Sequence, residues 1–154
     1  MITYIENNDI FSSSADCLIN PVNCMGTMGK GLALEFKHRW PGMDNMYKSW
    51  CKEGLLGLGK VGFYIAKDDT KKIICLFPTK IDWRKPSTIQ IIDLSLQSFN
   101  KNLYIVTEKT GRTINSVAFP KVGCGLGGLN FEYQIKPLLE KYFLTSQLQV
   151  EIYI

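Results

Sequence analysis

Hydrophobic and polar positions follow two different periods along this chain, and together they predict strands that alternate with helices. The clearest helical pattern follows Thr88, where apolar residues recur at spacings of three and four as far as Val106. A closing helix is predicted after Asn130, with a bend or a late start at Pro137. Shorter helices are predicted over Lys30–Trp40 and Met43–Glu53. Apolar runs predict strands at Ile2–Glu6, Asp16–Asn20, Val61–Ala66, Lys72–Pro78, Ser116–Pro120 and Leu148–Ile154.

This order of elements predicts an α/β layered domain with a mainly parallel or mixed sheet. The length of 154 residues favours one domain spanning residues 1–154. In such sheets, ligands bind at the carboxyl ends of the strands. Two glycine-rich loops and Lys80 each follow a predicted strand. We therefore expect these three segments to share one cleft.

Composition narrows the class of protein. The hydrophobic share of 45% and the charged share of 21% are ordinary for a soluble globular chain. No apolar run approaches the roughly 18 residues of a membrane span, and the N-terminus lacks a signal-peptide pattern. We expect a cytoplasmic monomer without membrane association. Five cysteines without C-x-x-C spacing favour reduced thiols over disulfides or zinc ligation.

Charge and histidine content exclude several kinds of chemistry. The net charge of +4 is compatible with an anionic ligand or with nucleic acid, although an ordinary solvated surface would give the same value. The sole histidine, His38, lies between two basic residues of a predicted helix and is expected at the surface. The chain therefore offers no base for Ser-His or Cys-His catalysis and no histidine set for zinc. We predict neither a metal site nor a cofactor.

The stretch Leu18–Gly31 reads L-I-N-P-V-N-C-M-G-T-M-G-K-G, an apolar run followed by a glycine-rich turn and a helix start. Unpaired N–H groups of the first helical turn favour a phosphate there. A triphosphate-binding Walker A loop is excluded, because it would need glycine at Cys24 and a hydroxyl at Gly31. A tight turn without any ligand stays open as the alternative.

The second glycine-rich loop matches G-x-G-x-x-G at Gly123, Gly125 and Gly128. Only 26 residues follow Gly128, too few for the remaining strands of a dinucleotide-binding half. We interpret this loop as a second clamp for phosphate or ribose, opposite the first.

Lys80 lies at the end of an apolar strand, close to Arg84 in the sequence. Like charge nearby would favour a neutral amine able to act as nucleophile or acid/base, while an exposed lysine that only attracts phosphate is the alternative. Trp83 could stack on a base or a sugar, or simply pack. Asn20 and Asn23 could hydrogen-bond sugar hydroxyls or water, or tie down the turn.

In combination these segments make the chain resemble a macrodomain, the ADP-ribose-binding fold. The resemblance rests on motifs that run through the chain in order: N-D-I at Asn8–Ile10, N-P-V-N-C-M-G-T-M-G-K-G-L-A-L-E-F at Asn20–Phe36, F-P-T-K-x-x-W-R at Phe77–Arg84 and P-K-V-G-C-G-L-G-G-L at Pro120–Leu129. It is similar to the branch that contains the DNA-ADP-ribosyl glycohydrolase antitoxins and the terminal ADP-ribose glycohydrolase. The family implies a three-layer α/β fold whose mixed sheet is flanked by helices.

The resemblance also implies a site. Asp9 and Ile10 would contact adenine, Asn23 would touch the distal ribose, and Lys80 matches the lysine that this branch uses in catalysis. In part of the branch an acidic residue of the second loop assists the lysine, and the matching position here is Gly127. The implied ADP-ribose-binding set is completed by Asn20, Gly26, Met28, Gly29, Lys30, Gly31, Pro78, Thr79, Gly123, Cys124, Gly125, Leu126, Gly127 and Gly128.

The function implied by the resemblance is a hydrolase that removes ADP-ribose from a modified target, with a DNA base favoured over a protein side chain. Lys80 would be the essential amine, and Asn23 would position the sugar or a water molecule. Two alternatives stay open: a non-catalytic reader that only binds ADP-ribose, and a phosphatase acting on ADP-ribose-1″-phosphate.

Overall fold

A computed structural model describes all residues, 1–154, and its centre is a six-stranded sheet in the order β1-β6-β5-β2-β4-β3. The five strands from β1 to β4 in this order pair in parallel, and the edge strand β3 is antiparallel to β4. The predicted mixed, mainly parallel sheet is confirmed. The strands are β1 (Ile2–Ile5), β2 (Cys17–Asn23), β3 (Gly62–Ile65), β4 (Ile73–Lys80), β5 (Ser116–Phe119) and β6 (Gln149–Tyr153).

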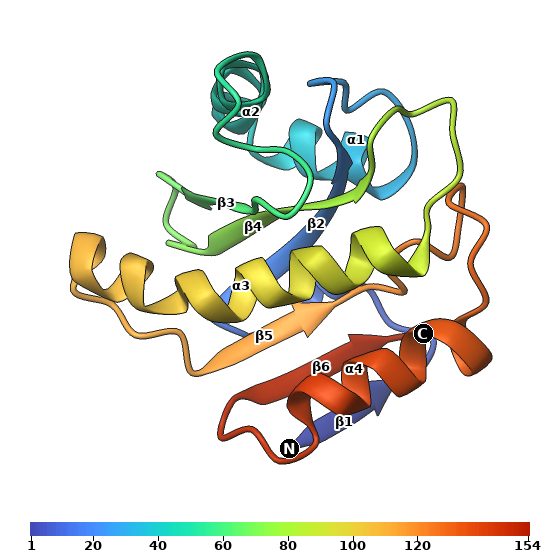
Figure 1. The fold of residues 1–154 in the computed structure, drawn as a ribbon. Helices are drawn as coiled ribbons and strands as arrows, with labels where there is room; N and C mark the ends of the chain where they lie inside the picture. The colour runs from blue at the N-terminus through green and yellow to red at the C-terminus, as the bar shows by residue number, and fades with distance from the viewer.

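Helices cover both faces of this sheet and create two cores. The helices are α1 (Gly31–Arg39), α2 (Gly42–Lys52), α3 (Ile89–Thr110) and α4 (Lys136–Phe143), with a 3₁₀ turn at Ile10–Ser12 and a π turn at Phe131–Ile135. Leu96 and Phe99 of α3 pack with Leu139 of α4 in one core, whereas Phe36 of α1 and Tyr47 of α2 belong to the other. Figure 1 shows α3 and α4 lying across the near face of the sheet.

The predicted helix ends agree with the capping chemistry. The Thr88 side chain accepts a hydrogen bond from the Ile91 N–H at 3.3 Å, and Gly111 ends the helix in the left-handed region at a φ of 70°. Asn130 caps the π turn by accepting from the Tyr133 N–H at 2.8 Å. The α-helix proper starts only at Lys136, so the late start predicted from Pro137 is confirmed.

Two strands extend further than their apolar runs predicted, and this extension builds the site. β2 continues to Asn23 and β4 continues to Lys80, where the two residues are register partners after an irregularity between Val22 and Asn23. Parallel pairing holds these polar residues in extended backbone, although their side chains resemble a loop in sequence. Because β2, β4 and β5 run parallel, the segments that follow them emerge at one edge of the sheet.

The structure also bears on the expectations for His38, for the cysteines and for membrane-spanning segments. His38 is exposed, and all five cysteines are free thiols, of which Cys17 and Cys75 are buried in the core. None of the helices combines the length and the apolar character that a membrane crossing requires.

Candidate functional site

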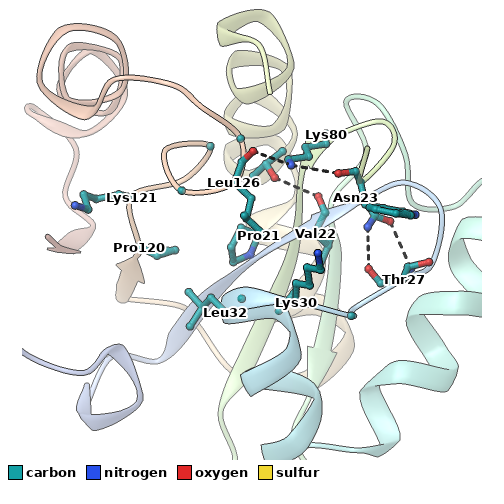
Figure 2. A pocket seen from close by; sticks show the side chains of 18 residues that line it. Pro21, Val22, Asn23, Thr27, Lys30, Leu32, Lys80, Pro120, Lys121 and Leu126 are labelled. Carbon is teal, nitrogen blue, oxygen red and sulfur yellow. Dashed lines mark hydrogen bonds between the residues drawn. The ribbon is translucent and has the colours of Figure 1, made fainter. Parts of the chain in front are cut away.

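A cavity of about 540 Å³ opens at the carboxyl edge of the sheet, between three segments. The first loop (residues 24–30) follows β2, the β4–α3 segment (residues 81–88) follows β4, and the second loop (residues 120–130) follows β5. We call this cavity the cleft; Figure 2 shows the side chains that line it. The shared cleft expected from the three strand ends is present.

Most of the predicted loop residues line the cleft. The lining includes Asn23, Gly29, Lys30, Gly31, Thr79, Lys80, Gly123, Gly125, Leu126 and Gly127. The predicted residues that lie outside this lining are Asp9, Ile10, Asn20, Gly26, Met28, Pro78, Cys124 and Gly128. The glycine loops and the two residues predicted to be catalytic are therefore brought together.

The residues outside the lining have other surroundings. Asn20 is fully buried, and its Nδ2 points at the sulfur atoms of Met28 (3.6 Å) and Met43 (3.9 Å) in the core beneath the first loop. Met28 is 2% exposed, so its side chain also faces that core. Asp9 caps the 3₁₀ turn by accepting from the Phe11 N–H at 2.9 Å.

Pro78 and Cys124 have structural contacts as well. The buried Pro78 carbonyl accepts a hydrogen bond from Ser95 Oγ at 2.6 Å, which ties β4 to α3. Cys124 is half-buried, and burial raises the pKa of its thiol. A protonated thiol of this kind does not provide a nucleophile.

Asn23 ties the first loop to the sheet and keeps one donor free. Its Oδ1 accepts from the Met25 N–H at 2.9 Å and from the buried Tyr47 hydroxyl at 2.8 Å, while its Nδ2 donates to the Thr27 carbonyl at 2.8 Å. An amide nitrogen carries two hydrogens, so one of them makes no hydrogen bond within the protein. The structural reading of Asn23 is therefore confirmed, because its side chain fixes the turn, and its contact with a sugar hydroxyl or water stays a prediction.

Lys80 is held between the second loop and the β4–α3 segment. Its Nζ donates to the Leu126 carbonyl at 3.1 Å and makes a longer contact of 3.5 Å with the Trp83 carbonyl. These contacts are the dashed lines at Lys80 in Figure 2. Arg84, the like charge expected beside it, is paired with Asp82 at 2.6 Å. The geometry thus supports a positioned amine but does not support repulsion by an unpaired Arg84.

The N-terminus of α1 faces the cleft. Gly31, Leu32 and Ala33, the first residues of α1, line the cleft, and Lys30 at the N-cap makes no side-chain capping bond. The first N–H groups of a helix have no intrahelical partner, and the helix dipole favours negative charge beside them. The helix start from which a phosphate cradle was predicted therefore faces the cleft, and phosphate binding there stays a prediction.

The two glycine loops approach each other closely over the cleft. A Cβ added at Gly31 would lie 3.9 Å from Leu126 Cδ1 of the second loop. Gly31 and Gly123 have φ values of 61° and 75°, a region that disfavours side chains. Glycine at these positions permits the backbone turn, whereas a Cβ at Gly31 would only make an ordinary contact with Leu126.

Gly127 occupies a space that no side chain could share. A Cβ there would overlap Ser87 Oγ and the Gly123 carbonyl oxygen, and it would lie 2.9 Å from the Gly123 carbonyl carbon. The Ser87 N–H also donates to the Gly127 carbonyl at 3.0 Å. This loop packs against the start of α3, and that packing leaves no space for an acidic side chain at position 127.

Sequence reasoning missed part of the lining. The cleft is also lined by eight residues outside the predicted binding set: Pro21, Val22, Thr27, Leu32, Ala33, Trp83, Pro120 and Lys121. Trp83 was left open between stacking and packing, and it is half exposed. The signal for Pro120 and Lys121 was their position directly after a strand, which is where ligands contact such sheets.

Comparison with known proteins adds the following findings. The model of the Macro domain family matches residues 19–136. A curated relative from Mycobacterium tuberculosis, DNA ADP-ribosyl glycohydrolase, is 37% identical over 99% of this chain and 42% of its own length. The chain thus spans less than half of that relative.

Solved structures agree with this likeness. The macrodomain of Mycobacterium tuberculosis DarG matches with a TM-score of 0.85 and 36% identity, over 99% of this chain and 97% of that one. Thermosipho africanus DarTG in complex with ADP-ribose matches with a TM-score of 0.84 and 33% identity, over 99% of this chain and 41% of that one.

Proposed function

This chain belongs to the macrodomain family, and from that premise we propose that it hydrolyses the bond between ADP-ribose and a modified DNA base. The relative from Mycobacterium tuberculosis is named for this activity, and the Thermosipho africanus structure holds ADP-ribose. The proposal rests on one observation. Asn23 and Lys80 are register partners on neighbouring strands, and both line the cleft together with residues of the two glycine loops.

The surroundings of the cleft suggest how ADP-ribose would lie in it. The diphosphate would sit on the N-terminus of α1, with the second loop on its other side. The distal ribose would then reach Asn23 and Lys80, where the free amide hydrogen of Asn23 could bind a ribose hydroxyl. The adenosine end would extend past Leu32 and Pro120, towards the 3₁₀ turn that Asp9 caps.

The chemistry that fits these residues is direct displacement by water. Water attacks the anomeric carbon of the distal ribose, the bond to the base breaks, and its electron pair remains on the base. Lys80 donates a proton to the departing base and recovers one from the attacking water, so that ADP-ribose and the free base are released. Asn23 orients the sugar for this step.

The second loop offers no acid to assist a covalent route. Gly127 stands at the position where part of the resembling branch carries that acid, and its backbone leaves no room for a side chain. A nucleophilic amine needs a base or a lowered pKa to become effective. We therefore propose that Lys80 transfers a proton and does not become attached to the sugar.

A panel of three substrates tests the proposed function. ADP-ribosylated single-stranded DNA, protein ADP-ribosylated on glutamate, and ADP-ribose-1″-phosphate are incubated with equal enzyme, and released ADP-ribose and phosphate are quantified by chromatography. We expect release from DNA to be fastest. Phosphate release without activity on DNA would favour the phosphatase, and tight ADP-ribose binding without turnover of any substrate would favour a reader.

The setting of this activity is also proposed. We expect the protein to act in the cytoplasm as a monomer, with no cofactor and no membrane partner. Sedimentation at micromolar concentration tests the monomer, and cell fractionation tests the location.

A further inference from the structure

The leaving group in this reaction needs a surface beside Lys80, and the β4–α3 segment provides one. Lys80 contacts the Trp83 carbonyl on one side and the Leu126 carbonyl on the other. The side chains of Trp83 and Leu126 are 50% and 71% exposed, and both line the cleft. The backbone carbonyls of two residues from opposite segments therefore hold the amine, and the exposed side chains of the same two residues belong to the cleft.

The turn that carries Trp83 is held by an ion pair. Asp82 accepts from the Arg84 N–H at 2.9 Å, from Arg84 Nε at 3.0 Å and from Nη2 at 2.6 Å, and its carbonyl accepts from the Lys85 N–H. These bonds close the turn around Trp83. Ile81 also joins the first loop, because its carbonyl accepts from the Cys24 N–H at 3.0 Å. The indole is thus presented on an ordered segment even though half of it is exposed.

From this geometry we propose that Trp83 and Leu126 form a subsite that binds an unpaired nucleobase, the leaving group, with the base stacked on the indole. The subsite rests on the proposed function. An indole offers a planar π surface that any base can stack on, whereas a glutamate side chain gains little from it. Lys85, two residues further along, makes no ion pair and can contact a neighbouring phosphate.

The subsite selects the state of the DNA as well as the chemical class. A base within a duplex has both faces covered by its neighbours, so it cannot stack on Trp83 without leaving the helix. Single-stranded DNA presents its bases without that cost. The modified base in single-stranded DNA is therefore the preferred substrate.

Kinetics on a single-stranded ADP-ribosylated oligonucleotide test the subsite with three variants. Trp83→Ala removes the stacking surface, Trp83→Phe keeps a smaller one, and Tyr104→Ala removes an aromatic that is 57% exposed on α3 and outside the cleft lining. We expect Trp83→Ala to lower kcat/KM by about 5- to 100-fold, mainly through KM. Trp83→Phe should lie between it and wild type, and Tyr104→Ala should match wild type. The Kd of free ADP-ribose should change less than about threefold in every variant, which also reports on folding.

The outcomes separate the subsite from the function beneath it. If wild type releases ADP-ribose from the oligonucleotide but Trp83→Ala stays within twofold of it, the subsite is overturned and the function stands. An equal loss in kcat/KM and in affinity for free ADP-ribose also overturns the subsite, because Trp83 would then contact ADP-ribose. If wild type releases nothing from DNA, the proposed function fails and the subsite fails with it.

Discussion

Replacing Gly127 by alanine tests whether the shape of the second loop excludes the acid that part of the resembling branch carries at this position. The new Cβ would overlap Ser87 Oγ and the Gly123 carbonyl oxygen. The Ser87 side chain is 4% exposed and cannot rotate into solvent without repacking, and Gly123 O is backbone. The loop must therefore move away from the start of α3.

The expected loss of stability follows from the free energy that this movement of the loop costs. Inserting atoms into a filled space costs about 1–3 kcal/mol. For a domain of this size, that corresponds to a fall in Tm of roughly 2–12 °C. The displaced loop would also carry Leu126 away from Lys80, so affinity for ADP-ribose should fall as well.

Thermal unfolding and calorimetry with ADP-ribose measure both effects. Gly125→Ala is the matched control, because an added Cβ there meets nothing within 4 Å. We expect Gly125→Ala to keep the wild-type Tm within about 2 °C. A Gly127→Ala variant that is as stable as Gly125→Ala and binds ADP-ribose as wild type does would refute the steric reasoning.

Five further predictions concern side chains beside the first loop and Lys80. Tyr47→Phe removes the hydroxyl that donates to Asn23 and should lower the free energy of unfolding by about 0.5–1.5 kcal/mol, measured in urea, with a loss of kcat. Asn23→Ala removes the side-chain hydrogen bonds to Met25 and Thr27 of the first loop and to Tyr47 of α2, so we expect a larger loss of stability than in Tyr47→Phe and weaker ADP-ribose binding by calorimetry. Burial raises the pKa of the Cys51 thiol to about 11 from 9.0, so its thiolate is scarce at pH 8 and iodoacetamide should modify it about a hundredfold more slowly than an exposed cysteine, by mass spectrometry. Since this pKa is higher in the folded state, stability is full below pH 9 and should decline between pH 9 and 11, less so in Cys51→Ala. Borohydride added during turnover should leave the Lys80 peptide at its unmodified mass, whereas a reduced sugar adduct would contradict proton transfer by Lys80.

The order of strands and helices was predictable because each element has a periodic apolar pattern, and the family motifs located the glycine loops. The apolar pattern did not predict the full length of β2 and β4. Asn23 and Lys80 are polar and follow apolar runs, so they resembled loop residues, while pairing between the strands keeps them extended. Only the register shows that they lie side by side.

The two asparagines show what alternation could and could not predict. Leu18, Asn20 and Val22 alternate along β2, and Leu18 and Val22 both belong to the core under α1 and α2. The period of two therefore placed Asn20 in that core, although its amide suggested a ligand contact. The burial of Met28 could not be predicted from sequence, because nothing in a glycine-rich loop indicates that one of its side chains faces the core. Trp83 lies in a turn that the Asp82–Arg84 pair closes, and no periodicity describes such a turn.

Lys80 is the centre of this account, and its removal provides the most direct test. Single-turnover release of ADP-ribose from modified single-stranded DNA is compared in wild type, Lys80→Ala and Lys101→Ala, a lysine exposed on α3. Proton transfer by a positioned side chain contributes about 10²–10⁴-fold, so Lys80→Ala should lose at least about a hundredfold in rate while Lys101→Ala loses none. ADP-ribose affinity should remain within about fivefold in both variants. A Lys80→Ala variant that releases ADP-ribose at the wild-type rate would contradict the account.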